Sequence, residues 1–249
     1  MVTAVATDLT LDRGDMLPSS VPSQEDILSF ATTKNISRRG LTVTVALLSV
    51  SVTASSSRAQ DACPDVEVLF ARGSGELPGL GIVGEPLVDA ITNGLSELQV
   101  SAYAVEYLAD LAQTSAGSGA DDMTSHLVAT AERCPDTLFV VGGYSQGGSV
   151  TDIAIDIPTV LGIGDSIPAQ FQDRIRAVVV FGNPLALFGD AIMDDAKWGS
   201  RAREFCNFGD PVCGAGVNVL AHLTYGFDGS ADEGAAFAVE QVRASRGAP

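Results

Sequence analysis

Short runs of β-branched and aromatic residues alternate with segments of helical spacing along most of the chain after residue 65. The runs that predict strands are residues 66–70, 102–107, 138–141, 177–181 and 203–208. The segments that predict helices are residues 86–98, residues 121–133, a stretch that starts at Gln146, and residues 232–246. This alternation is typical of an α/β domain built on a mostly parallel sheet. The continuously apolar run at 138–141 is expected of a strand that is covered on both faces.

The first 59 residues differ from the rest of the chain and have the pattern of a signal peptide. Arg38 and Arg39 precede an apolar run at 41–52, and Ser57-Arg58-Ala59 forms a small-x-small cleavage pattern before Gln60. An apolar run of about a dozen residues is too short to cross a bilayer of roughly 30 Å as a helix. We therefore expect export without a permanent membrane anchor.

The part that precedes the arginine pair is polar and longer than a signal peptide needs. Either Met16 is a later start, or residues 1–35 form a disordered extension. In both cases we assign residues 1–59 to a leader and residues 60–249 to one folded domain, which is long enough to bury a full core.

The net charge of the chain is −17. A strongly acidic surface repels phosphate backbones and lacks the electrostatic attraction on which nucleic-acid binding mostly depends, so no nucleic-acid partner is expected. The simplest meaning of the charge is solubility in an extracellular setting.

All four cysteines follow the leader: Cys63, Cys134, Cys206 and Cys213. An even number of cysteines in an exported chain predicts disulfides, although four cysteines allow three pairings. A zinc site is a weaker alternative, because the cysteines are not spaced as CxxC pairs and the chain has only two histidines. We expect no metal.

Gly143-Tyr144-Ser145-Gln146-Gly147 matches the G-x-S-x-G pattern of a nucleophile elbow. The pattern by itself often arises by chance. Here a predicted strand ends just before it and helix-compatible residues follow it, which is the setting that the motif requires. The flanking glycines are expected because side chains would clash in so tight a turn. Ser145 is therefore the candidate nucleophile.

A nucleophilic serine needs a general base, and the base needs a group that orients it. His126 lies in a predicted helix before the serine, and we interpret it as a surface residue. His222 follows the serine, as the Ser–acid–His order of α/β-hydrolases requires. Asp210 lies between them and is the candidate acid. On spacing alone, a structural Gly-Asp-Pro turn without a catalytic role is about as good an interpretation of Asp210.

Four motifs in this order resemble the cutinase family, including actinobacterial cutinase-like esterases. They are Ala71-Arg72-Gly73-Ser74, the Gly-Tyr-Ser-Gln-Gly elbow, the Cys206-Asn-x-Gly-Asp-x-Val-Cys213 segment, and His222-Leu-Thr-Tyr225. The likeness covers roughly residues 63–246. Residues 75–84 and residues 187–200, which include the lone Trp198, depart from the family pattern, and we expect them to border the acyl site.

The resemblance implies a three-layer α/β-hydrolase-type sandwich, with a central sheet flanked by helices, as the catalytic domain. It implies Ser145, Asp210 and His222 as the triad. It also implies an oxyanion hole formed by Ser74 and the amide of Gln146. The disulfides that it implies are Cys63 with Cys134 and Cys206 with Cys213.

The function expected from these residues is that of a secreted serine esterase, acting as a monomer without metal or organic cofactor. The resemblance adds the substrate class, which is short- to medium-chain acyl esters, polyester or lipid. An acyltransferase, a thioesterase or a phospholipase with the same triad is one alternative. A secreted binding protein that keeps the fold without turnover is another.

Overall fold

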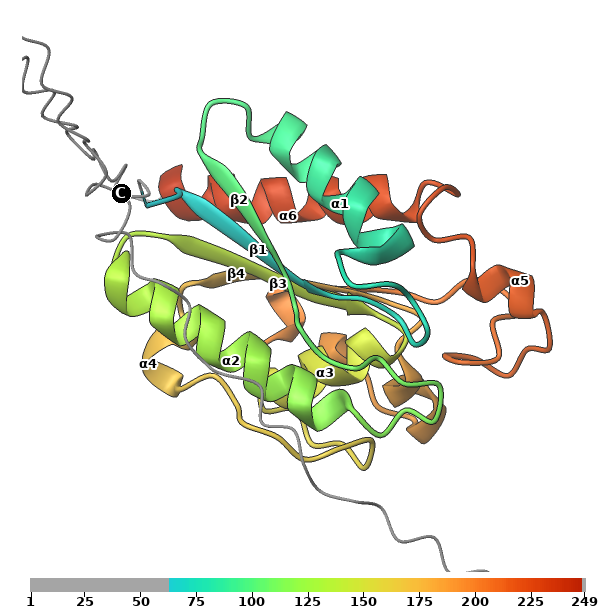
Figure 1. Cartoon of the computed structure of the whole chain (residues 1–249). Coiled ribbons are helices and arrows are strands. Elements are labelled where there is room, and N and C mark those ends of the chain that lie inside the picture. Colours follow the sequence, from blue (N-terminus) through green and yellow to red (C-terminus); the bar gives the residue numbers. More distant parts are fainter. Residues whose placement is uncertain (1–62, 248–249) are drawn as a thin grey trace, which may run out of the picture. The chain divides into compact units, whose positions relative to one another are not determined.

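Five parallel strands form the central sheet of the computed structural model, which describes residues 63–247 (Figure 1). The strands lie in the order β2-β1-β3-β4-β5, and each neighbouring pair is parallel. Their bounds are β1 Val66–Ala71, β2 Val100–Ala104, β3 Leu138–Tyr144, β4 Ile175–Phe181 and β5 Ala202–Phe205. Because the strands are parallel, their carboxyl ends meet at one edge, where the loops that follow β1, β3, β4 and β5 come together.

Helices cover both faces of this sheet, which confirms the expected three-layer α/β sandwich. The longer helices are α1 Gly81–Gly94, α2 Ala116–Arg133, α3 Gln146–Ala154 and α6 Ser230–Gly247. The shorter ones are α4 Ala169–Gln172, α5 Val219–His222, and the 3-10 turns η2 Pro184–Phe188, η3 Ile192–Asp194 and η4 Gly199–Arg201. Figure 1 shows α1 and α6 on one face of the sheet and α2 and α3 on the other.

Alternate residues of each strand supply two separate cores, as the two-residue period of a strand requires. In β1, Val68 and Phe70 pack with side chains of α1 and α6, whereas Leu69 and Ala71 pack with those of α2 and α3. All four side chains are fully buried. This double burial explains why the strands have continuous apolar sequences.

The structure moves several element boundaries relative to the sequence prediction. The helix predicted from Pro86 begins at Gly81, so this proline lies inside α1 rather than in its first turn. The carboxylate of Glu76 accepts a hydrogen bond from the amide of Ile82 at 2.7 Å, which satisfies a donor at the beginning of the helix. Gly79 and Gly81 give this part of the sequence the appearance of a loop. The group that supports the start of the helix is the Glu76 side chain, which lies before the helix.

Helix α2 begins at Ala116, five residues before the predicted start at 121. The added turn contains Gly117 and Gly119, residues of low helix propensity. A Cβ atom on Gly117 would lie 2.0 Å from the carbonyl oxygen of Ile163, and one on Gly119 would lie 2.7 Å from Val150. These glycines therefore allow close packing inside a helix.

The remaining differences are smaller. The strand predicted over 102–107 is β2, which spans Val100–Ala104. The last predicted strand, 203–208, is β5, which ends at Phe205. Helix α6 covers the predicted 232–246 with a few residues more. The expected leader, residues 1–59, lies outside the described residues, and its boundary with the folded domain stays a prediction.

Both disulfides that the resemblance implied are present. Cys63 is bonded to Cys134 and Cys206 to Cys213, with sequence separations of 71 and 7 residues. In the chain-entropy model the longer loop contributes about 4 kcal/mol to stability and the shorter one about 2 kcal/mol. None of the helices between residues 63 and 247 has both the length and the apolar character that a membrane crossing requires.

Candidate active site

Ser145 occupies a sharp turn between β3 and α3. Its backbone has φ 56° and ψ −118°, a positive-φ conformation that a residue with a side chain adopts only under strain. The amide of Ser145 donates to the carbonyl oxygen of Phe181, the last residue of β4, at 2.9 Å. The nucleophile candidate is therefore held in a strained conformation at the carboxyl edge of the sheet, as the elbow motif predicts.

The two glycines of the elbow are required by close backbone contacts. A Cβ atom on Gly143 would lie 2.0 Å from the carbonyl oxygen of Gly147. One on Gly147 would lie 1.9 Å from the carbonyl oxygen of Ala71, at the end of β1. Since these atoms belong to the backbone and cannot rotate away, any side chain at either position would displace the turn.

A buried polar pair braces α3 behind the serine. The side-chain amide of Asn183, which follows β4, donates to Oδ1 of Asp152 at 3.0 Å. Burial raises the pKa of the Asp152 carboxyl well above its usual value, which favours the neutral acid. This contact ties the helix that begins at the elbow to the segment that follows the neighbouring strand.

His222 ends the short helix α5 and lies against the elbow. A Cβ atom on Gly182 would lie 2.6 Å from Cε1 of His222, so the imidazole rests directly on a glycine backbone. The rings of His222 and Tyr144 have centroids 4.9 Å apart, and the Tyr144 hydroxyl donates to the carbonyl oxygen of His222 at 2.7 Å. These contacts fix the imidazole beside the elbow.

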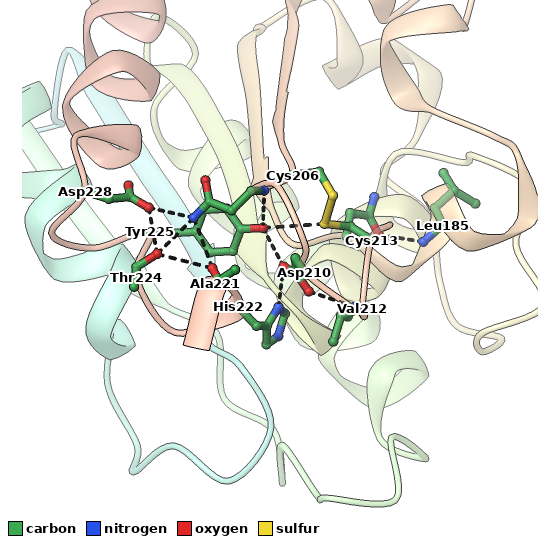
Figure 2. The surroundings of a disulfide bond; sticks show 12 residues. Leu185, Cys206, Asp210, Val212, Cys213, Ala221, His222, Thr224, Tyr225 and Asp228 are labelled. Carbon is green, nitrogen blue, oxygen red and sulfur yellow. Dashed lines mark hydrogen bonds and ion pairs between the residues drawn. A yellow bond between two sulfur atoms is a disulfide. The ribbon is translucent and has the colours of Figure 1, made fainter. Parts of the chain in front are cut away.

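Asp210 lies beneath this imidazole and is fully buried. Nδ1 of His222 is 2.8 Å from Oδ2 of Asp210 (Figure 2). Because an ionised carboxylate only accepts hydrogen bonds, Nδ1 carries the proton, and the lone pair of a neutral imidazole is then on Nε2. The other carboxylate oxygen, Oδ1, accepts from the amide of Val212 at 2.7 Å. The arrangement gives a histidine whose free nitrogen is able to take a proton.

Ser145 and His222 are brought together through their neighbours. Tyr144, the residue before Ser145, contacts the imidazole. The amide of Ser145 donates to the carbonyl oxygen of Phe181, and the next residue, Gly182, lies against the imidazole. Ser145 is 5% exposed and His222 is 8% exposed. Within residues 63–247, no hydrogen bond joins the serine hydroxyl to the imidazole. In enzymes without bound substrate this contact is often long and shortens in the substrate complex.

Ser74 lies beside the elbow, although it is distant from it in sequence. Its hydroxyl donates to Oε1 of Gln146 at 3.3 Å. Gln146 is the first residue of α3, so its own amide has no carbonyl partner within the helix. The two residues that the resemblance assigns to an oxyanion hole are therefore neighbours.

The loop that carries Ser74 is held by two charged side chains. The carboxylate of Glu76 accepts from the amides of Gly73 and Ile82. The guanidinium of Arg72 donates to the carbonyl oxygens of Glu76, Val105 and Tyr107. The sequence analysis quoted Arg72 only as part of a motif and gave Glu76 no role. Two of the Arg72 partners, the carbonyl groups of Val105 and Tyr107, are 33 and 35 residues away, so no local pattern reveals them.

His126 lies in α2 and is not part of this arrangement. Its Nε2 is 3.0 Å from Oε1 of Glu67, and its ring stacks on Tyr103 with centroids 3.5 Å apart. The side chain is 27% exposed, so the interpretation as a surface residue was wrong in part. His126 is a half-buried structural partner of a buried glutamate.

Two residues that contact the histidine or its acid had no assigned role in the sequence analysis. Tyr144 is the variable second position of the elbow pattern. Tyr225 ends the motif that begins at His222, and its hydroxyl donates to Oδ2 of Asp210 at 2.5 Å.

Trp198 was expected to border the acyl site, but it is fully buried and donates its indole N–H to the carbonyl oxygen of Ile155. Among the described residues, no group of three or more His, Cys, Asp and Glu side chains is arranged to hold a metal ion.

Comparisons with known proteins identify the family of this chain. The family model described as Cutinase matches residues 62–242. A protein from Kineococcus radiotolerans named Cutinase is 47% identical over 186 residues, which cover 74% of this chain and 63% of that relative. A protein from Mycobacterium tuberculosis named Probable carboxylesterase Culp3 is 39% identical over 188 residues, covering 74% of this chain and 71% of the relative.

A solved structure shows the same relationship. The cutinase of Trichoderma reesei, in complex with a phosphonate inhibitor, is 30% identical with a TM-score of 0.59. The match covers 72% of this chain and 77% of that one. The family model covers most of the chain, and the relatives and the solved structure agree with it. This chain therefore belongs to the cutinase family of carboxylic ester hydrolases.

Proposed function

We propose that this protein is a secreted serine esterase in which Ser145 is the nucleophile, His222 the general base and Asp210 the residue that orients the base. The observation that carries the proposal is the 2.8 Å hydrogen bond between His222 and Asp210 beside a strained serine turn. The Ser145 turn follows β3, and the His222–Asp210 pair lies against its neighbours Tyr144 and Gly182, which supports a site at the carboxyl edge of the sheet, where ligands bind in open α/β folds.

The proposed reaction runs in two steps. Nε2 of His222 takes the proton of Ser145 while Oγ attacks the ester carbonyl carbon, and the carbonyl oxygen becomes an oxyanion. The imidazolium then gives its proton to the leaving alcohol as the carbon–oxygen ester bond breaks. Water repeats the sequence on the acyl-enzyme, releases the carboxylic acid and restores the serine hydroxyl.

The oxyanion is proposed to be stabilised by the amide of Gln146 and by Ser74. A donor that points at charge formed only in the tetrahedral intermediate lowers the barrier to its formation. Replacing Ser74 by alanine should therefore reduce kcat by about 10²-fold with a smaller change in KM. Steady-state kinetics on a soluble short-chain ester would measure this. An unchanged kcat would remove the Ser74 hydroxyl from the proposed hole.

The proposed substrates are short- to medium-chain acyl esters, with polyester or lipid as the natural form. Large apolar side chains are exposed on the loops that follow the strands and on the helix of the histidine. The exposed apolar residues of these loops and of α5 are Leu77, Leu111, Leu187, Phe188, Phe208, Val219 and Leu220. Leu111 lies against Gly75, next to Ser74. Apolar groups near a polar reaction centre favour substrates that are themselves largely apolar.

Secretion is proposed from the leader pattern together with the two disulfides. Disulfides persist mainly in oxidising compartments, so the bonded cysteines support an extracellular location. The monomeric state stays a prediction.

The proposal is tested with a fluorophosphonate probe, which bonds covalently to an activated serine. The wild-type protein should be labelled at one site, and the Ser145→Ala variant should not be labelled. Labelling of heat-denatured protein serves as the background. An unlabelled wild type would favour a binding protein without turnover, and labelling that persists in Ser145→Ala would place the nucleophile elsewhere. A product assay with and without an added alcohol separates hydrolysis from acyl transfer.

A further inference from the structure

We propose that Tyr225 is a positioning residue for the reaction: its hydroxyl shares one oxygen of Asp210 with His222, and so holds the carboxylate in place and limits the basicity of the imidazole. This inference rests on the proposed function. It adds a fourth member to the Ser145, His222 and Asp210 arrangement, one that does not contact the reacting atoms.

The first support is the pattern of hydrogen bonds around Asp210. Oδ2 accepts from both Nδ1 of His222, at 2.8 Å, and the hydroxyl of Tyr225, at 2.5 Å (Figure 2). Oδ1 accepts from the amide of Val212 at 2.7 Å. Three donors therefore hold the carboxylate, one at Oδ1 and two at Oδ2, and together they fix its orientation.

The direction of the tyrosine hydrogen bond follows from its other partner. The amide of Asn207 lies 2.9 Å from the Tyr225 hydroxyl oxygen and is able only to donate. The hydroxyl also lies 3.5 Å from Sγ of Cys213, but a disulfide sulfur is only a weak acceptor, so the single phenolic proton points at Asp210. Burial, followed by the hydrogen bond to Asp210, raises the pKa of the Tyr225 hydroxyl above its ordinary value. The hydroxyl thus stays protonated, and stays a donor, across the pH range in which an esterase works.

The second support is that the tyrosine comes from the buried core and the carboxylate from a loop. The ring of Tyr225 is fully buried in the core formed with α1 and α6, and it packs against Phe181 and Tyr144. Asp210 instead belongs to the loop closed by the Cys206–Cys213 disulfide. Tyr225 therefore connects a carboxylate on a loop to a rigid part of the molecule.

This hydrogen bond has a consequence for the charge on Asp210. A carboxylate that accepts a strong hydrogen bond from a phenol stabilises a neighbouring imidazolium less than one that accepts from the imidazole alone. When the phenol is removed, the carboxylate attracts the proton on His222 more strongly, so the imidazole becomes protonated at a higher pH. The reaction needs the neutral imidazole, and activity is then lost at a higher pH on the acid side.

The test is Tyr225→Phe, which keeps the buried ring and removes only the hydroxyl. We expect kcat to fall by about tenfold, with KM changed by less than about twofold. We also expect the acid limb of the kcat/KM profile to move upward by about half to one pH unit. Rates on a soluble p-nitrophenyl ester, measured over a pH range that includes both limbs, supply both quantities. A tyrosine that only fills the core would alter thermal stability and leave the pH profile where it is.

Tyr103→Phe is the matched control. The Tyr103 hydroxyl also donates to a carboxylate, that of Asp122 on α2, at 3.0 Å. This pair joins the edge strand β2 to α2 and makes no contact with the proposed triad, so its removal should leave both kcat and the acid limb unchanged. An equal shift in both variants would mean that the shift does not come from the contact with Asp210, and would overturn the proposal.

Two other outcomes would also overturn it: a folded Tyr225→Phe with unchanged kcat and acid limb, or one in which only KM changes. If the variant does not fold, 3-fluorotyrosine placed at position 225 replaces it. This residue keeps the hydroxyl but is a stronger acid and hence a stronger donor, so the acid limb should move downward, and an unmoved limb would refute the role. A wild type that neither hydrolyses esters nor reacts with the fluorophosphonate probe would instead refute the proposed esterase function.

Discussion

Replacing His222 by alanine should reduce kcat by about 10⁴- to 10⁶-fold, because the serine hydroxyl then has no base to take its proton. The imidazole packs against Tyr144 of the elbow and is hydrogen-bonded to the buried Asp210. Substrate affinity should change little, because the imidazole acts on the proton of Ser145 and is not proposed to bind the acyl chain. Single-turnover kinetics on an activated ester would measure the residual rate.

His126→Ala is the control for this experiment. His126 pairs with Glu67 and stacks on Tyr103 in a different part of the domain, so its removal should leave kcat within about twofold. A modest loss of thermal stability is expected, since Glu67 is left buried with one partner fewer. If His126→Ala were inactive and His222→Ala active, the assignment of the base would be wrong.

Replacing Asp210 by asparagine should reduce kcat by about 10⁴-fold while the fold is kept. The amide of Val212 donates to Oδ1 of Asp210, so the asparagine should place its carbonyl oxygen there and its NH₂ group toward His222. Nδ1 of His222 must then accept instead of donate. The imidazole proton moves to Nε2, which is the nitrogen that has to be free to take the serine proton.

The loss should appear in kcat rather than in binding, and the Ser145 turn should be unaffected. Asp122→Asn, which alters the carboxylate bound to Tyr103 on the edge strand, is the matched control and should retain full activity. An Asp210→Asn variant within about tenfold of wild type would show that the carboxylate does not set the imidazole tautomer, and that Asp210 is only a turn residue.

The sequence predicted the α/β class and most strands because a sheet covered on both faces needs continuous apolar runs, as at 138–141 and 177–181. It failed where a helix begins in small residues. Gly117 and Gly81 resemble loop residues, but one packs against the Ile163 carbonyl and the other lies in a turn held by the Glu76 carboxylate. Those partners are distant along the chain or outside the helix, so no local pattern reveals them.

The elbow serine was predicted with its setting, since a strand, two glycines and a helix are local features that specify one backbone conformation. Asp210 was undecided on spacing alone, and it was assigned only through the resemblance to a family. Whether a carboxylate meets an imidazole depends on how the loop after β5 folds against α5, which is a tertiary contact.

The sequence by itself therefore determined the sheet, the elbow and the family, because each depends on residues close together or on motifs in a set order. Only the tertiary structure decided that Asp210 lies beneath His222, that His126 pairs with Glu67, and that the Tyr225 hydroxyl reaches the same carboxylate oxygen as the imidazole. Hydrogen bonds of this kind depend on distance and direction between residues far apart in the chain, and these arise only when the sheet and its two helical layers have packed.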